Sequence, residues 1–272
     1  MVEQYIEEGT MIAAARKDTH DVLTVEDVSK SFGGVQALDG CTFSMRGGGV
    51  TGLIGPNGAG KSTVVNIVTG FVKADRGTVR LGGHGLHSLS PLEIARIGVG
   101  RTFQDLRLFE GMTVLENLLV AREAREQSTP TARRSRRRSA RRLDLDAATE
   151  VLDRLGLGDG ADRWVRELSY AERKLVSLGR VLMTEPRVVF LDEPSSGVDL
   201  NTLERFGDEI RTLREQGAMV GVIEHNVEVI RMWCDDVVFM TRGQVLRQGS
   251  PDEVFADSTV LSEYVGGGAA HA

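Results

Sequence analysis

Residues 55 to 63 carry the strongest chemical signal in the sequence. They match the pattern G-x-x-x-x-G-K-[ST], with both glycines, Lys61 and Ser62 in register. Glycines let backbone N–H groups turn inward around phosphate oxygens, and a helix that starts there adds a partial positive charge. We expect Lys61 to reach the β- and γ-phosphates of a nucleotide and Ser62 to ligate Mg²⁺. The whole predicted phosphate loop is Gly55, Pro56, Asn57, Gly58, Ala59, Gly60, Lys61, Ser62 and Thr63.

Two adjacent carboxylates, Asp192 and Glu193, follow an apolar run at residues 188–191. Such a run is typical of a buried strand in a parallel sheet, and ligands bind at the carboxyl ends of these strands. We expect Asp192 to hold Mg²⁺ near the β- and γ-phosphates through water, and Glu193 to act as general base on an attacking water. The alternative is a solvated turn at the strand end, which the apolar strand and the phosphate loop upstream disfavour.

The pattern of apolar residues predicts the elements that position these groups. A strand at 49–54 precedes the phosphate loop, and a helix at 64–68 follows it. Ser169 and Glu172 form a capping-box pattern at the start of another helix. Further strands are predicted at 22–28, 37–44, 77–82, 188–194, 219–223, 236–241 and 244–248, and further helices at 91–97, 112–124, 147–157, 169–183, 200–216, 251–255 and 260–265.

Composition limits the class of protein. The chain has 272 residues, is 41% hydrophobic and has a mean hydropathy of −0.14, which indicates a soluble globular protein. No run of about 18 apolar residues could span a bilayer. The first 20 residues include acidic side chains and lack a signal-peptide core, which favours the cytoplasm. The net charge of −6 gives no general attraction to nucleic acid.

Several residues have a plain structural interpretation. Cys41 and Cys234 are expected to be buried free thiols, because they lack metal-ligand spacing. His84 and His87 are expected to be exposed loop residues. An aromatic residue such as Phe32 is usually part of a core, but its place ahead of the phosphate loop favours stacking on a purine ring.

A strongly basic stretch at residues 133–142 holds seven arginines in ten residues. Such a run repels itself and is usually a solvated loop or helix end, which we favour. The alternative is contact with anionic lipid headgroups. Binding to DNA is a poorer interpretation, because no aromatic residues or reading motif accompany the run.

Taken together, residues 21–266 resemble the nucleotide-binding ATPase subunit of an ATP-binding cassette (ABC) transporter. Residues 101–118, and the ending at 264–266, are similar to the ATPase subunits of branched-chain (hydrophobic) amino acid importers. The family's motifs occur here in its order: Phe32, the loop 55–63, Gln104, the signature motif 168–172, Asp192-Glu193, the loop 195–199 and His225.

This resemblance implies an α/β fold with a P-loop NTPase core that is RecA-like and has a mainly parallel sheet. An antiparallel β subdomain and an inserted α-helical subdomain complete it. The implied organisation is an N-terminal tail at 1–20, an ATP-binding core at 21–104 and 185–266, a helical subdomain with the signature motif at 105–184, and a C-terminal tail at 267–272.

The resemblance also implies roles for single residues. Phe32 would stack on adenine, and Gln104 would touch the metal or the water and take part in catalysis. His225 would contact the γ-phosphate and position the water and Glu193, and Asp199 would lie at a dimer seam. Ser169, Tyr170 and Ala171 would bind the γ-phosphate of the nucleotide held by a second chain.

The implied cofactors are ATP and Mg²⁺. The implied partners are a second ATPase subunit, identical or different, separate transmembrane permease subunits and an extracytoplasmic substrate-binding protein, with no nucleic acid. The protein would hydrolyse ATP at the cytoplasmic face of the cell membrane and couple it to uptake of branched-chain or hydrophobic amino acids or similar small solutes.

Three alternatives stay open at this point. An exporter or lipid-extracting ATPase would share every catalytic motif, and only residues 101–118 argue against it. A soluble ABC ATPase acting on DNA or ribosomes would normally carry two cassettes or a long coiled coil. A small-molecule kinase would leave the signature motif and His225 unexplained. Within the signature motif, Tyr170, Ala171 and Glu172 stand where the family commonly has two glycines and a glutamine.

Overall fold

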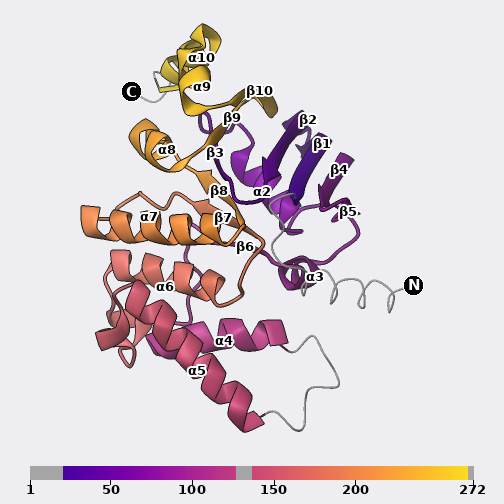
Figure 1. The fold of residues 1–272 in the computed structure, drawn as a ribbon. Helices are drawn as coiled ribbons and strands as arrows, with labels where there is room; N and C mark the ends of the chain where they lie inside the picture. Colours follow the sequence, from indigo (N-terminus) through magenta and orange to yellow (C-terminus); the bar gives the residue numbers. More distant parts are fainter. Residues whose placement is uncertain (1–20, 127–136, 269–272) are drawn as a thin grey trace.

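The computed structural model describes residues 21–126 and 137–268. The predicted tail at 1–20, residues 269–272 of the C-terminal tail and residues 133–136 of the arginine run lie outside these ranges. In Figure 1 the strands occupy the upper part of the molecule, and a group of helices lies beneath them.

One sheet of the described chain is antiparallel. It contains β1 (Val22–Phe32), β2 (Val35–Arg46), β4 (Arg76–Leu81) and β5 (His84–Gly85), in the order β2-β1-β4-β5. The turn between β1 and β2 is Gly33-Gly34, and both glycines have positive φ. The strands predicted at 22–28 and 37–44 are therefore present and longer than expected. His84 and His87 are exposed, as predicted, although His84 belongs to β5 and not to a loop.

The second sheet carries the predicted parallel strands. Its order is β10 (Gln244–Gly249), β9 (Asp236–Thr241), β3 (Val50–Ile54), β8 (Met219–Ile223), β7 (Val188–Asp192) and β6 (Val99–Arg101). All neighbours are parallel except β10, which runs antiparallel to β9. Every residue of β3 and β8 is buried, which explains why these strands are wholly apolar apart from Thr51 and glycine.

This sheet brings the ends of three strands to one edge. Asp192 is in register with Ile223, and Leu53 with Ile223, so β3, β7 and β8 end side by side. The phosphate loop, Glu193 and His225 each begin within three residues of such an end. The predicted α/β fold with a mainly parallel sheet and an added antiparallel sheet is confirmed.

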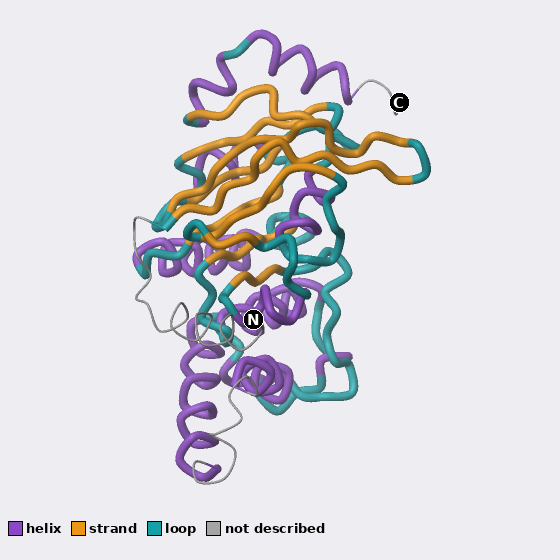
Figure 2. The backbone as a smooth tube through the Cα atoms, turned by 90° about the vertical axis from the view of Figure 1, so that its right-hand side faces the viewer, coloured by secondary structure: helices purple, strands orange, loops and turns teal. Residues whose placement is uncertain are grey.

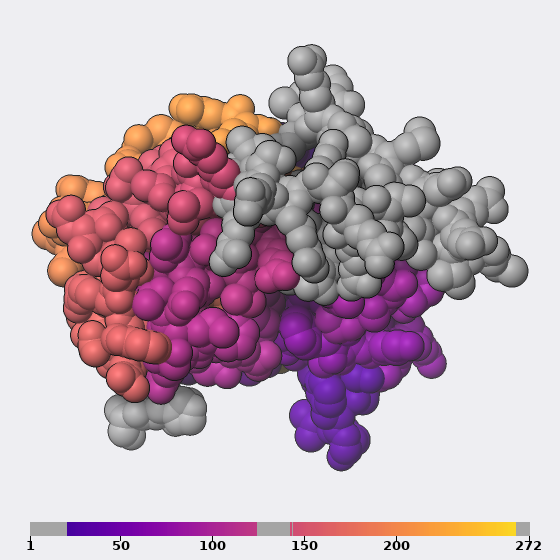
Figure 3. All heavy atoms as spheres, turned by 90° about the horizontal axis from the view of Figure 1, so that it is seen from below, coloured from indigo at the N-terminus to yellow at the C-terminus, as the bar shows by residue number. Residues whose placement is uncertain are grey.

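Three helices form the lower part in Figure 1: α4 (Val114–Glu126), α5 (Arg137–Arg154) and α6 (Tyr170–Leu182). Short 3₁₀ turns at Gly158–Gly160 and Val165–Glu167 connect α5 to α6. Seen from below, this group forms one side of the molecule (Figure 3). The other helices are α2 (Lys61–Val68), α3 (Pro91–Arg96), α7 (Leu200–Glu215), α8 (Val227–Trp233), α9 (Pro251–Ala256) and α10 (Ser258–Gly268). In Figure 2 the helices that lead to the C-terminus lie above the strands.

Helix α5 differs from the prediction. It begins at Arg137 and not at residue 147, so residues 137–142 of the arginine run lie in its first turns. The apolar pattern begins only near Ala147, but arginine has a high intrinsic helix propensity. A polar helical extension therefore has no periodicity that would reveal it.

The buried residues form two clusters. One lies between the parallel sheet, α7, α8 and the helices α4 to α6, and the other between the two sheets and α2. Cys41 and Cys234 are buried free thiols, as predicted. Within the described ranges, none of the helices combines the length and apolar character needed to cross a bilayer.

Candidate functional site

The phosphate loop has the backbone that its glycines predict. Gly60 precedes α2 with a φ of 99°, and a Cβ added there would lie 2.6 Å from Leu38 Cδ2. Gly58 also has a positive φ, of 78°, but faces open space. Glycine is therefore required at Gly60 for conformation and for close packing, and at Gly58 for conformation alone. Backbone N–H groups in such a turn can face an anion.

Lys61 lies inside this loop. Its side chain is buried, and Nζ donates to the carbonyl oxygens of Gly55 at 2.7 Å and Pro56 at 3.0 Å. Burial lowers the pKa of Lys61, and the carboxylates of Glu193 and Asp192 oppose that shift. The predicted phosphate-binding lysine therefore lies within the electrostatic reach of both carboxylates. Ser62 follows it in the first turn of α2 and is exposed.

Glu193 is the centre of the predicted catalytic group. His225 Nε2 lies 3.0 Å from Glu193 Oε1, and Gln104 Nε2 donates to Glu193 Oε2 at 3.5 Å. The three side chains come from the ends of β7 and β8 and from the segment after β6. Glu193 has a φ of +47°, which is uncommon for a residue other than glycine and is often found at functional positions. The structure therefore brings the three predicted catalytic side chains together.

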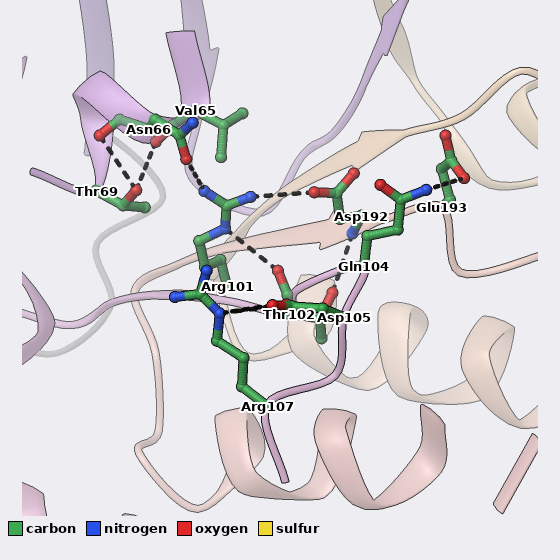
Figure 4. Close-up of polar contacts among 10 residues, drawn as sticks. All are labelled: Val65, Asn66, Thr69, Arg101, Thr102, Gln104, Asp105, Arg107, Asp192 and Glu193. Carbon is green, nitrogen blue, oxygen red and sulfur yellow. Dashed lines mark hydrogen bonds and ion pairs between the residues drawn. The ribbon is translucent and has the colours of Figure 1, made fainter. Parts of the chain in front are cut away.

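Asp192 is held by contacts that the sequence did not predict (Figure 4). Arg101 Nη2 donates to Asp192 Oδ2 at 3.0 Å, and Nη1 donates to Asn66 Oδ1 at 2.5 Å. The backbone N–H of Asp192 donates to Thr102 Oγ1 at 3.0 Å. Burial raises the pKa of Asp192, and the Arg101 guanidinium opposes that rise. Arg101 thus connects Asp192 to α2, the helix that follows the phosphate loop.

The oxygen atoms here suit Mg²⁺. This ion takes one or two carboxylates, and otherwise water and substrate phosphates, so the lack of any His, Cys, Asp or Glu cluster among the described residues does not disfavour it. Asp192 Oδ1 makes no hydrogen bond within the described chain, which leaves it available. Ser62 and Asp192 would hold the ion, which would neutralise charge on the phosphates. Gln104 directs its amide nitrogen at Glu193, so its predicted contact with the metal would be made through the amide oxygen.

The Arg101–Asp192 pair leads to a prediction about stability. The side chains of Arg101 and Asp192 are 7% and 12% exposed. Arg101→Met would leave a buried carboxylate unpaired, and we expect the free energy of unfolding to fall by about 3 kcal/mol in urea denaturation. The control is Arg107→Met, which breaks an exposed pair with Asp105 and should cost less than about 1 kcal/mol. Equal losses of unfolding free energy in the two variants would contradict a stabilising role for the buried Arg101–Asp192 pair.

The signature motif forms the start of α6. Ser169 is the N-cap, its Oγ accepts from Glu172 N at 3.2 Å, and Glu172 Oε2 accepts from Ser169 N at 2.7 Å. The predicted capping box is confirmed. Arg163 pairs with Glu172 at 2.6 Å, which offsets the carboxylate found where the resembled family has glutamine. Ser169 and Tyr170 are exposed, and the N–H groups of Tyr170 and Ala171, which the capping box does not use, are free to face an anion.

Phe32 and Asp199 are the remaining residues predicted for the nucleotide site and the dimer seam. Phe32 ends β1 and is 48% exposed, so it is not a core residue, and Lys30 Nζ lies 5.4 Å from its ring centre. Asp199 is the N-cap of α7, and its Oδ1 accepts from Thr202 N at 2.7 Å.

Sequence reasoning missed two buried charged residues beside Glu193. Lys174 Nζ donates to the carbonyl oxygens of Glu193 and Ser196, at 2.5 and 2.6 Å. Glu224 accepts from Ser195 N at 2.7 Å and from His225 N at 3.1 Å. Glu224 follows a wholly apolar strand, as Asp192 does, and that position was the available signal. For Lys174, the only signal in the sequence was its spacing of four residues from Tyr170.

Comparisons with known proteins agree with this geometry. A family model described as ABC transporter matches residues 38–196. The probable branched-chain amino acid transport ATP-binding protein LivG of Methanocaldococcus jannaschii is 34% identical over 255 residues, which cover 92% of this chain and 99% of that protein. The high-affinity branched-chain amino acid transport ATP-binding protein LivG of Escherichia coli is 34% identical over 254 residues, with 90% and 98% covered.

Solved structures give the same result. A crystal structure of a nucleotide-free ATP-binding cassette from an ABC transporter has a TM-score of 0.78 and 33% identity, and covers 90% of this chain and 98% of its own. A crystal structure of the ADP conformation of such a cassette also has a TM-score of 0.78 and 33% identity, with 91% and 100% covered.

Proposed function

The chain belongs to the ABC transporter family, and we propose that it is the ATP-hydrolysing subunit of an importer for branched-chain or other hydrophobic amino acids. The observation that carries this proposal is the grouping of Glu193, His225 and Gln104 beside the phosphate loop, at the ends of parallel strands. Relatives whose names state branched-chain amino acid transport match nearly the whole chain, which supports the class of solute.

In the proposed reaction, the loop 55–63 and Lys61 bind the phosphates of ATP, and Phe32 stacks on the adenine. Glu193 accepts a proton from a water molecule that attacks the γ-phosphate, and ADP and phosphate are released. His225 and Gln104 hold Glu193 and the water in line. Each of these groups acts by position and charge, as phosphoryl transfer requires.

We further propose that two chains form each complete site. Within the described residues, no hydrogen bond or ion pair joins residues 169–172 to the loop 55–63. The exposed start of α6 instead suits the γ-phosphate held by a second chain, with Ser169, Tyr170 and Ala171 facing it. Asp199 would lie at the seam between the chains. ATP would then hold the dimer together, and hydrolysis would release it.

Two membrane-spanning permease subunits would receive this motion at the cytoplasmic face of the membrane, with an extracytoplasmic binding protein supplying the solute. We propose residues 105–184 as the helical subdomain that meets the permease, and 21–104 with 185–266 as the ATP-binding core. The test is co-purification with membrane permease subunits, followed by ATPase assays. Stimulation by leucine, isoleucine or valine is expected, and stimulation only by unrelated solutes would contradict the proposed solute class.

Ala171 gives a prediction specific to this chain. Its methyl group stands where the family commonly has a glycine close to the partner's phosphate, and a side chain there can crowd the contact. We expect Ala171→Gly to leave the ATPase turnover number equal or higher, although glycine in α6 would cost up to about 1 kcal/mol of stability. Steady-state ATPase assays check this. A large loss of turnover in a folded variant would show that the alanine is needed.

A further inference from the structure

The first turns of α6 contact the loop that carries Glu193 in the same chain. Tyr170 and Lys174 lie four residues apart, so they share one face of the helix. A Cβ added to Gly197 would lie 3.2 Å from Tyr170 Cε1, which places that ring against the loop. Lys174 Nζ lies 5.3 Å from the centre of the Tyr170 ring and donates to two carbonyl oxygens of the loop.

Lys174 is an unusual residue to bury. Its side chain is 5% exposed, and it forms no salt bridge with a carboxylate within the described residues. A buried ammonium group is costly unless hydrogen bonds satisfy it. Here the backbone oxygens of Glu193 and Ser196 satisfy it, with Pro194 O at a longer 3.4 Å. The ammonium group of Lys174 therefore stabilises the backbone conformation of one loop, residues 193–196.

That loop needs support from outside itself. Glu193 has a left-handed φ of +47°, a conformation that surrounding contacts must maintain in a residue with a side chain. The N–H of Glu193 donates to Ile223 O at 2.9 Å, and the N–H of Ser195 donates to Glu224. The core thus fixes the N–H groups of Glu193 and Ser195, and the Ser196 N–H donates to Glu193 O within the loop at 3.2 Å. Lys174, from the helical part, adds the contact from outside to the carbonyl oxygens of Glu193 and Ser196.

We propose that Lys174 is a positioning residue through which α6 sets Glu193 for catalysis. The inference rests on the proposed function, in which Ser169 at the start of α6 meets the partner's nucleotide and Glu193 is the general base. One rigid helix then connects the two sites of the dimer. When the start of α6 docks on the partner's γ-phosphate, the same helix holds the base over this chain's own nucleotide.

The experiment compares Lys174→Met with Lys174→Arg in the full-length chain. A misplacement of about 1 Å in a catalytic group can cost about 100-fold in rate, and we expect a fall of that order in the turnover number of Lys174→Met. Its affinity for a fluorescent ATP analogue should not change, because Lys174 does not touch the phosphate loop. ATP-driven dimerisation should also persist in gel filtration. Lys174→Arg keeps charge and donors and should recover part of the turnover.

The matched control is Arg154→Gln. Arg154 also links the helical part to the core, through Glu209 at 3.0 Å, but lies away from Glu193. The Arg154→Gln variant should be less stable than the wild type but should keep its ATPase turnover number. Wild-type turnover in Lys174→Met, an equal loss of turnover in Arg154→Gln, or unfolding of both Lys174→Met and Lys174→Arg would overturn the proposal. A wild-type chain that fails to hydrolyse ATP would instead refute the proposed function itself.

Discussion

Glu193→Gln is expected to lower the ATPase turnover number by about 1000-fold, because it removes the group that accepts the proton of the attacking water. The amide is the same size as the carboxylate, so the contacts with His225 and Gln104 can persist. ATP binding to the loop 55–63 should be unchanged. Since ATP is then bound and not consumed, the variant should accumulate as a dimer, measured by gel filtration with and without ATP.

The control for this variant is Glu228→Gln. Glu228 is an exposed glutamate in the first turn of α8, close to His225 in the sequence, and its loss should leave turnover unchanged. Wild-type hydrolysis in Glu193→Gln would refute the general-base role. A monomer that binds ATP normally but does not dimerise would separate catalysis from the proposed assembly.

Ser169→Asp is expected to abolish dimer-dependent hydrolysis without affecting the fold. Aspartate caps a helix as well as serine does, so α6 should keep its start. The added negative charge, however, would face the γ-phosphate of the partner chain, and like charges opposed across an interface cost several kcal/mol. We expect turnover to fall by more than about 100-fold, with unchanged binding of an ATP analogue to the isolated chain.

The chain contains a matched control for this change. Ser250 is the N-cap of α9 in the same capping-box arrangement, with Glu253 in the place of Glu172. Ser250→Asp makes the same chemical change at a helix with no proposed role in catalysis, and its turnover should match the wild type. Loss of ATP binding in Ser169→Asp would indicate that α6 contributes to the site within one chain.

Much of this site could be predicted from the sequence because its motifs are local. The phosphate loop, the Asp192-Glu193 pair and the capping box at Ser169 each occupy a short stretch whose chemistry its own residues define. The parallel sheet followed from wholly apolar strands. The structure then placed Gln104 and His225 at Glu193, over separations of 89 and 32 residues, as the motif order had implied.

The residues that sequence reasoning missed act through tertiary contacts. Arg101 meets Asp192 and Asn66, which are 91 and 35 residues away. Lys174 bonds only to backbone oxygens, so no complementary side chain could reveal it. Neither contact leaves a periodic pattern. The early start of α5 was missed for a different reason, since its first turns are polar.

The proposed mechanism requires each ATP site to take Glu193 from one chain and Ser169 from the other. The direct test is a mixed dimer, purified with two different tags, that carries Ser169→Asp in one chain and Glu193→Gln in the other. Each variant alone should be inactive. In the mixed dimer one of the two equivalent sites keeps both residues, so we expect about half of the wild-type turnover. A mixed dimer as inactive as its parents would show that Ser169 and Glu193 of one chain serve the same site, and would contradict the claim.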